Sequence, residues 1–248
     1  MTLAGLAVMF FVIVFFAGKI VRPMAESYEK QKRFITDAGH EIKTPLTIIN
    51  ANVDLLETDP EDADCLHDIR QQTERLTTLT NDLVYLARME EADTSLEMTN
   101  IAVSEMISEA ASEFRALAAI QEKEFIYQIQ PGLFMRGNDK AIRQLINITI
   151  DNALKYSPEG GTVAVHFAQV RHTLQLNIYN TTQTAVNSEE LEHVFDRFYR
   201  MDHSRNSATG GHGIGLSVAK AIVEAHHGKI HAWSRDGCSF NITCIFPN

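Results

Sequence analysis

The sequence has 248 residues, of which 45% are hydrophobic, so it can form the core of one large domain or of two small ones. Its formal net charge of −10 argues against nucleic acid as a direct partner, because phosphate binding requires clustered Lys and Arg side chains. The cysteines, Cys65, Cys238 and Cys244, are widely spaced and show no CxxC or Cys/His metal spacing, which indicates reduced cytosolic residues.

An uncharged stretch from Leu3 to Ala17 opens the chain. With the apolar residues around Lys19 it nearly reaches the roughly 20 residues needed to cross a bilayer, and the Lys19 ammonium can extend to the interface. A cleaved signal peptide is the alternative, but the start MTLAG has no basic region and no small-x-small cleavage site is clear. We therefore predict a transmembrane helix over residues 1–22.

Basic residues follow this stretch and set its predicted orientation. They are Lys19, Arg22, Lys30, Lys32 and Arg33. The positive-inside tendency places the rest of the chain in the cytoplasm, where ATP is found, so we predict a single-pass protein of the cell membrane with cytoplasmic C-terminal domains. The juxtamembrane linker, residues 23–33, is too short for a folded domain. A signal should therefore pass almost directly from the membrane span to the next helix.

The segment FITDAGHEIKTPL follows the linker and combines residues that suit a phosphate-accepting imidazole. Glu41 can hold one ring nitrogen of His40 through its proton, which leaves the other nitrogen unprotonated as a nucleophile. Thr44 lies one turn after His40 on the same helix face, where its hydroxyl can orient a water. Pro45 removes a backbone donor and should bend or loosen the helix. An HE pair alone would more often be a solvated helix face.

Residues 34–95 are predicted to form two helices joined by a turn over Thr58–Asp62, where Pro60 suits the first position of a new helix. Apolar residues recur at helical spacing in the first helix and close to heptad spacing in the second. A two-helix hairpin cannot enclose its own apolar stripe, so we expect a homodimer in which two hairpins form a four-helix bundle. A hairpin packed on the neighbouring domain of its own chain is the alternative.

Residues 96–248 have mixed periodicity and follow a polar hinge, EADTS. They predict an α/β sandwich, a mixed sheet with helices on one face. The expected strands are 101–103, 123–130, 133–136, 162–170, 173–180 and a final pair joined across Asp236–Gly237, and the expected helices are 104–121, 138–156 and 214–226. Asn138 is the expected cap of the second of these helices, and Asp-Gly is a strong hairpin signal.

Within this domain, the segment DNALKYS supplies groups for a nucleotide and its metal. Asn152 offers a neutral oxygen to magnesium, a hard cation that keeps several waters and binds few protein ligands. Lys155 lies on the same helix face, within reach of phosphate oxygens. Further on, GGHGIGL (Gly210–Leu216) precedes a helix, so its backbone amides and the helix N-terminus can close on phosphates. A glycine run alone is often a plain loop.

Taken in order, these motifs resemble those of membrane sensor histidine kinases of two-component systems. HEIKTPL matches the H-box pattern H-E-x-[KR]-T-P-L without a gap, DNALKYS resembles the N-box, FDRFYRMD the F-box, and GGHGIGL the glycine-rich lid box. The resemblance extends from about Pro23 to Asn248. It implies a HisKA-type dimerisation and phosphoacceptor domain followed by a GHKL (Bergerat-type) ATP-binding fold, shared with gyrase, Hsp90 and MutL proteins.

The resemblance also implies roles for individual residues. His40 would be the phosphorylated residue, with Glu41 and Thr44 beside it, and Asn152 would hold Mg²⁺. Besides Asn152, the residues expected around ATP are Lys155, Tyr156, Asn180, Arg197, Gly211, Gly213, Gly215 and Leu216. The phosphoryl group would pass to an aspartate on the receiver domain of a response regulator. Such kinases usually sense outside the membrane between two spans, so we expect either a truncated chain or sensing in the membrane or through a partner.

Two departures from the family pattern affect the nucleotide site. Where these kinases carry DxGxG, with the Asp on the adenine amino group, this chain has NTTQT, and Asn180 can accept from that amine only without charge. Ile148 stands where the family often has an N-box Asn, and Asn147 points about 100° away on a helix. A non-kinase, membrane-anchored regulatory dimer with phosphatase or docking activity at Thr44 is therefore the alternative function.

Overall fold

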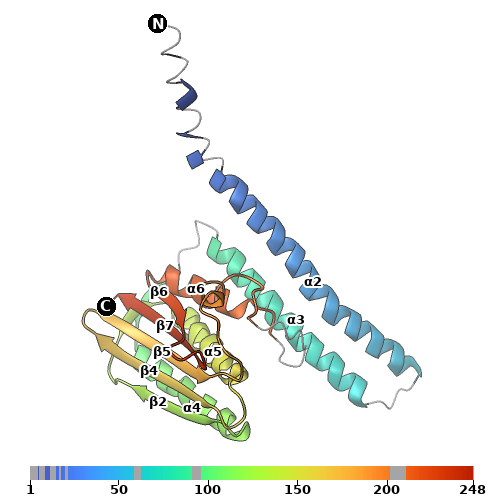
Figure 1. The fold of residues 1–248 in the computed structure, drawn as a ribbon. Coiled ribbons are helices and arrows are strands. Elements are labelled where there is room, and N and C mark those ends of the chain that lie inside the picture. Colours follow the sequence, from blue (N-terminus) through green and yellow to red (C-terminus); the bar gives the residue numbers. More distant parts are fainter. Residues whose placement is uncertain are drawn as a thin grey trace. The chain divides into compact units, whose positions relative to one another are not determined.

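The computed structural model of this chain describes residues 5, 9–11, 15–16, 18–19, 22–58, 63–90, 96–201 and 211–247 (Figure 1). The chain divides into two compact units, residues 1–76 and 77–248. Most of the predicted membrane stretch, the tip of the predicted turn and the EADTS hinge lie outside the described residues. Within the described ranges, no helix combines the length and apolarity that a membrane crossing requires.

The two predicted helices of residues 34–95 are confirmed as α2 (Arg22–Thr58) and α3 (Ala63–Glu90). Pro45 lies inside α2, which nevertheless continues to Thr58. Helix-spaced apolar residues explain the length of α2, but several of its large apolar side chains are exposed, and Leu46 and Val53 keep 45% and 42% of their accessible surface. The hairpin therefore leaves part of its apolar surface uncovered within one chain.

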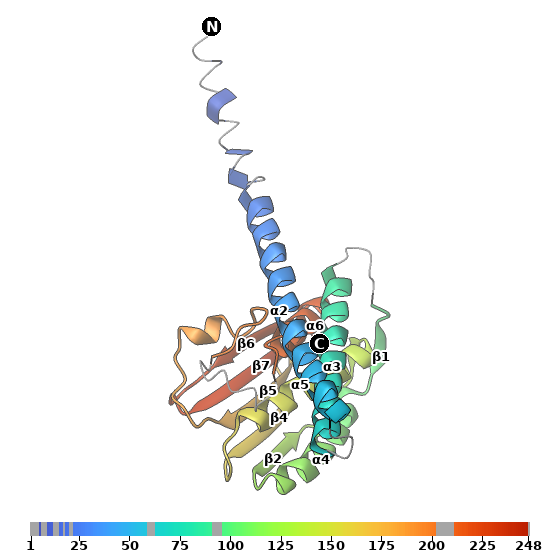
Figure 2. The same ribbon diagram turned by 90° about the vertical axis from the view of Figure 1, so that its right-hand side faces the viewer.

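The second unit contains the α/β sandwich that the sequence predicts. Its elements in chain order are β1 (Thr99–Ile101), α4 (Val103–Ile120), β2 (Glu124–Ile129), β3 (Met135–Gly137), α5 (Asp139–Tyr156), β4 (Thr162–Val170), β5 (Thr173–Thr181), η2 (Glu190–Glu192), α6 (Gly215–Ala225), β6 (Lys229–Trp233) and β7 (Ser239–Pro247). The main sheet has the order β2-β4-β5-β7-β6, which Figure 2 shows from one edge to the other. Only the β2–β4 pair is parallel, so the sheet is mixed.

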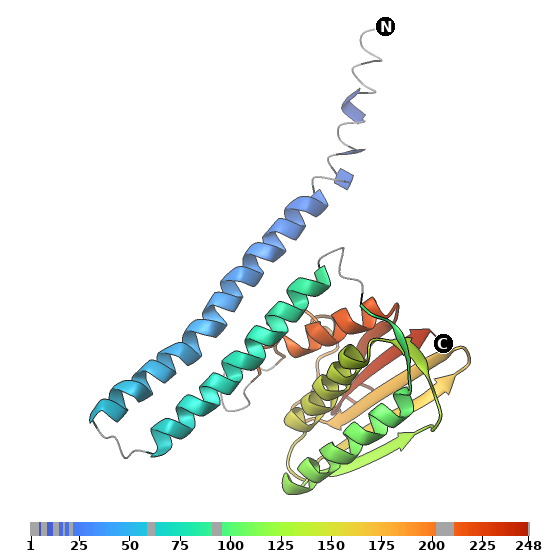
Figure 3. The ribbon, with the colours of Figure 1, turned by 180° about the vertical axis from the view of Figure 1, so that it is seen from behind.

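Helices α4, α5 and α6 cover one face of the sheet. In Figure 1 the sheet lies in front of these helices, and in the opposite view of Figure 3 the helices lie in front of the sheet. Alternate residues of β4 and β5 point into the layer between them, because successive side chains of a strand face opposite sides. The fully buried side chains of this core include Leu145, Ile150, Leu154, Val163, Phe167, Leu174, Val218 and Ile222.

Local chemistry fixes the ends of several elements. The Asn138 side chain accepts a hydrogen bond from the Ala141 amide (3.0 Å), so the predicted cap of α5 is confirmed. Gly237 has a positive φ of 70° in the turn between β6 and β7, and this predicted hairpin is also confirmed. The sequence did not indicate the pairing of β1 with β3, which forms a separate two-stranded sheet.

A buried histidine joins the end of α6 to the start of α5. His226 Nε2 accepts a hydrogen bond from the Asn138 backbone amide (3.0 Å), and Nδ1 lies 2.7 Å from the Ile222 carbonyl oxygen. Since a backbone amide can only donate, the neutral ring must carry its proton on Nδ1 and donate it to Ile222. Burial lowers the pKa of His226, with a smaller lowering from His227, while the Ile222 contact opposes them.

Candidate functional site

The phosphoacceptor motif lies on α2, with His40 and Thr44 both exposed. The Thr44 hydroxyl donates to the His40 carbonyl oxygen over 3.2 Å, a bond of the kind that Ser and Thr make to the preceding helical turn. Glu41 is half-buried next to His40. One helical turn therefore presents an accessible imidazole with a carboxylate and a hydroxyl beside it.

The nucleotide-binding residues predicted on α5 occupy its last two turns. Asn152, Lys155 and Tyr156 are all half-buried, and the Lys155 ammonium lies 5.7 Å from the centre of the Tyr156 ring. Burial raises the pKa of the neighbouring Asp151, and the positive charge of Lys155 opposes that rise. The end of this helix thus offers one amide, one ammonium and one phenol on adjacent turns.

The glycine-rich segment meets α5 at Gly211. A Cβ placed on Gly211 would lie 2.7 Å from Lys155 Nζ and 3.4 Å from the Tyr156 hydroxyl oxygen, so the Gly211 backbone passes directly beside both side chains. Gly211 and Lys155 are far apart in the sequence and are brought together only by the fold. An ammonium next to glycine backbone is suited to hold an anion such as a phosphate.

The other two described glycines of this segment have different neighbours. Gly213 faces the backbone of Phe198, and a Cβ on Gly215 would lie 3.3 Å from Ile148 Cγ2. Gly215 and Leu216 form the start of α6. Gly210 lies outside the described residues. Of the described glycines in the motif, Gly211 is therefore the one beside Lys155, whereas Gly213 and Gly215 allow close packing.

Asn180 is the next-to-last residue of β5, lies on the helix-covered face of the sheet and is 1% exposed. Its Nδ2 donates one of its two hydrogens to the Thr181 carbonyl oxygen (2.9 Å). The Thr181 hydroxyl accepts from the Thr162 amide (3.0 Å) and lies 3.4 Å from the hydroxyl of Ser157, the residue that ends α5. The sequence reading missed this link between Thr181 and Ser157, although Ser157 belongs to the DNALKYS motif.

The glycine-free segment after Asn180 has a structural explanation. None of residues 180–187 has a positive φ, so the path taken here does not require glycine. The Thr182 amide donates to the Cys238 carbonyl oxygen (3.0 Å) and the Val186 amide to the Gly237 carbonyl oxygen (2.8 Å). The turn between β6 and β7 therefore holds this segment through backbone hydrogen bonds.

Arg197 lies in a turn that leads to Phe198 and is half-buried. Metal coordination would rest on few protein groups, because no three His, Cys, Asp or Glu side chains converge within the described ranges. That donor set fits magnesium, which binds through one or two protein oxygens together with substrate phosphates and waters.

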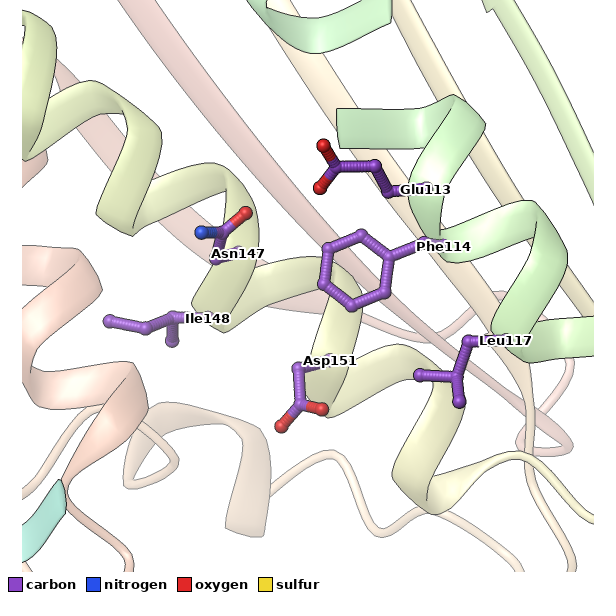
Figure 4. Close-up of a pocket in the computed structure, with 6 residues that line it drawn as sticks. All are labelled: Glu113, Phe114, Leu117, Asn147, Ile148 and Asp151. Carbon is purple, nitrogen blue, oxygen red and sulfur yellow. The ribbon is translucent and has the colours of Figure 1, made fainter. Parts of the chain in front are cut away.

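A surface cavity of about 460 Å³ opens between α4 and α5 (Figure 4). Its lining residues are Glu113, Phe114, Leu117, Asn147, Ile148 and Asp151. Figure 4 shows the Phe114 ring between the two helices, with the Asp151 carboxylate on the facing side. None of the six is a predicted nucleotide ligand, but Asp151 feels the charge of Lys155 and Ile148 lies beside Gly215.

Comparison with known families assigns both parts of the chain. Residues 30–92 match the His Kinase A (phospho-acceptor) domain, and residues 137–248 match the histidine kinase-, DNA gyrase B- and HSP90-like ATPase domain. The chain thus carries a phospho-acceptor domain followed by an ATPase domain of this type. Sensor kinases also match the chain along nearly its whole length, so the chain contains the two domains that are typical of a two-component histidine kinase.

Two curated relatives illustrate the similarity. The chain is 30% identical over 237 residues to the sensor histidine kinase RppB of Synechocystis sp. The alignment covers 93% of this chain and 52% of RppB. It is 31% identical over 235 residues to the sensor protein DltS of Streptococcus agalactiae, which covers 94% of this chain and 58% of DltS. The chain therefore spans little more than half the length of these relatives.

Solved structures agree on the fold. The histidine kinase AdeS of Acinetobacter baumannii aligns with a TM-score of 0.66 and 22% identity, over 84% of this chain and 97% of AdeS. The histidine kinase ThkA, in a complex with the response regulator protein TrrA, aligns with a TM-score of 0.72 and 19% identity, over 94% of this chain and 66% of that one. At these identities the comparisons support the fold alone.

Proposed function

We propose that the chain uses ATP to phosphorylate His40 and then transfers the phosphoryl group to an aspartate on a response regulator. The observation that carries this proposal is the convergence of Lys155, Tyr156 and Gly211 in an ATPase-type domain, in a chain that also exposes His40 on a phospho-acceptor helix. ThkA supports the partner, because its solved structure holds a response regulator protein.

In the phosphorylation step, an unprotonated ring nitrogen of His40 attacks the γ-phosphorus of ATP. The bond from that phosphorus to the β,γ-bridging oxygen breaks and ADP leaves. Lys155 and the Gly211 backbone would hold phosphate oxygens, and Asn152 would hold magnesium, which neutralises phosphate charge when bound. Glu41 orients the ring and stabilises its positive charge. Thr44 would direct a water at the phosphorylated partner, giving a phosphatase activity.

Base recognition falls to Asn180 in this proposal. We assign the Asn180 Oδ1 acceptor to the exocyclic amine of adenine, while Nδ2 donates to the Thr181 carbonyl oxygen. Guanine carries a carbonyl oxygen in place of that amine and cannot donate there. A neutral acceptor gives a weaker hydrogen bond than the Asp of the family pattern. We therefore assign ATP as the preferred nucleotide, with a smaller margin over GTP than an Asp would give.

We further propose that the chain is a homodimer anchored in the cell membrane, with its two C-terminal domains in the cytoplasm. Large apolar side chains that are more than half exposed between residues 9 and 16 support a membrane contact; they are Met9, Phe10, Phe11, Phe15 and Phe16. The exposed Leu46 and Val53, seven residues apart on α2, support a second hairpin as the partner. Sedimentation of Leu46→Glu/Val53→Glu should show monomers, whereas Thr47→Glu should stay dimeric.

Radiolabelled ATP incubated with the full chain in detergent tests the central proposal. The wild-type chain should acquire an acid-labile, base-stable phosphate, and His40→Gln should acquire none, because Gln has no nucleophilic nitrogen. His67→Gln is the matched control, since His67 is an exposed histidine on the other helix of the hairpin. Labelling that survives in His40→Gln would overturn the assignment. Nucleotide binding without any labelling of the wild type would favour the non-kinase regulatory dimer.

A further inference from the structure

Phe198 adopts an unusual backbone conformation beside the glycine-rich segment. Its φ is 61°, in the left-handed region, which a bulky residue rarely occupies. The Phe198 amide donates to the Gly213 carbonyl oxygen over 2.9 Å. This hydrogen bond connects the FDRFYRMD segment to the glycine-rich segment through backbone atoms alone.

Backbone hydrogen bonds on both sides of Phe198 hold this conformation. Amides of His193, Asp196 and Tyr199 donate in turn to the carbonyl oxygens three residues earlier, over 3.1, 2.8 and 3.3 Å. His193 Nδ1 also lies 2.9 Å from an Asp196 carboxylate oxygen, and its ring centre lies 5.7 Å from that of Tyr199. Strained backbone persists only where the surroundings hold it, and here three consecutive turns do so.

Gly213 leaves no room for a side chain on its side of the contact. A Cβ there would lie 2.7 Å from the Phe198 carbonyl carbon, 2.8 Å from the Tyr199 oxygen and 2.9 Å from the Phe198 Cα. These are backbone atoms, which cannot rotate away. Gly213 also has a φ of 68°, so a substitution would be strained even without the collision.

Gly211 contrasts with Gly213 two residues later. Its nearest neighbour is the flexible end of Lys155, and it does not have a positive φ. One glycine is therefore placed for contact with a phosphate, and the other is placed for contact with backbone. Because they are separated by a single residue, the position of Gly211 depends on where Gly213 is held.

We propose that Phe198 and Gly213 form a backbone clasp that positions Gly211 and the first turn of α6 for ATP. Both are positioning residues and neither contacts the nucleotide. The clasp rests on the proposed use of ATP and assigns Gly213 a role other than phosphate binding. Loosening it should weaken ATP binding, because Gly211 would no longer be held beside Lys155, while the phosphorylation step itself would keep its groups.

Kinetics of the full chain with two glycine variants test the clasp. Gly213→Ala should raise the KM for ATP about tenfold or more and change kcat by less than about threefold. Gly132→Ala is the matched control, because Gly132 has a similar φ of 74° with nothing within 4 Å of an added Cβ. It should cost the same backbone strain and leave the KM unchanged. A Gly213→Ala chain with wild-type KM, or with a loss confined to kcat, would overturn the clasp.

Two substitutions of Phe198 keep the test decisive if Gly213→Ala fails to fold. Asn tolerates the left-handed conformation and a β-branched Val does not, yet both remove the ring. Phe198→Val should therefore raise the KM for ATP well above that of Phe198→Asn. Equal KM values would show that the ring and not the backbone matters, and the clasp would be wrong. An inactive wild-type chain would instead refute the proposed function itself.

Discussion

On α2, His40 and Thr44 share a helix face because one helical turn separates them, and that geometry needs nothing beyond the local helix. In the α/β unit, Lys155 meets Gly211 only after α5 and the start of α6 have packed on the same sheet. The first arrangement is encoded in consecutive residues, and the second in the whole fold.

This difference governs how substitutions should act on the two regions. A change on the exposed face of α2 removes one chemical group and leaves its neighbours in place. A change in the α/β unit can remove a ligand, or it can move a ligand by disturbing the core that holds it. The α/β unit has fully buried side chains on both the strands and the helices, so its site is sensitive at a distance.

Among changes in the α/β unit, Asn152→Ala gives the largest expected effect. Removing the one protein oxygen that we assign to magnesium should lower ATP-dependent phosphorylation by about a hundredfold or more. Asn147→Ala is the matched control, since Asn147 is an exposed asparagine on the same helix that lines the cavity between α4 and α5. Initial rates with radiolabelled ATP measure both. If the two variants lose activity equally, α5 was disturbed and Asn152 is not a ligand.

Leu145→Ala tests the distant sensitivity of the assembled site. Leu145 is 0% exposed in α5, so truncation should destabilise the α/β unit by about 2–5 kcal/mol, through lost burial and the cavity left behind. Leu117→Ala on α4, where the side chain is 38% exposed, should cost less than about 1 kcal/mol. Urea unfolding followed by circular dichroism measures both. Similar costs at the two positions would mean that the core is not packed as described.

Asn180→Asp should strengthen nucleotide binding. Restoring a charged acceptor for the adenine amine should raise ATP affinity about tenfold and widen the preference for ATP over GTP. Calorimetric titration of wild type and variant with both nucleotides measures this. Tight and strongly adenine-selective binding by the wild type would show that other groups, such as the Thr181 and Ser157 hydroxyls, already compensate for the missing charge.

The regular elements of the α/β unit were predictable from the sequence because their causes are local. Alternation in TVAVHFAQV predicted β4 with the bounds that the structure gives, and Asn138 and Gly237 marked a helix start and a hairpin. The same holds for α2, which continues past Pro45 to Thr58. The identity of the functional segments followed from motifs that are contiguous in the sequence.

The parts that could not be predicted depend on tertiary contacts. Nothing local in FDRFYRMD indicates that Phe198 is left-handed, because that conformation is imposed by the turns before it and by Gly213. The loss of glycine after Asn180 looked damaging, yet the β6–β7 turn supports that backbone without any positive φ. The separate neighbours of Gly211, Gly213 and Gly215 likewise emerge only when the segments are packed together.

The smallest expected effect concerns His226, which connects the end of α6 to the start of α5 in the α/β unit. The phosphoacceptor motif on α2 depends on no such connection between distant elements. Because burial lowers its pKa in the folded state, the unfolded chain binds the proton more readily. Stability should therefore be complete above the unfolded pKa of about 6.5 and should fall as the pH drops from there through the folded pKa. Protonation of the ring places a hydrogen on Nε2, so Nε2 can no longer accept the hydrogen bond from the Asn138 amide.

His226→Gln sharpens this prediction, because a glutamine carbonyl can accept from the Asn138 amide but does not titrate near neutral pH. The variant should lose part of the decline in stability below about pH 6.5, whereas His166→Gln, at an exposed position on β4, should keep it. Urea unfolding at a series of pH values measures the slope. An unchanged slope in His226→Gln would mean that other groups carry the acid sensitivity, and that the link between α6 and Asn138 does not depend on a neutral imidazole.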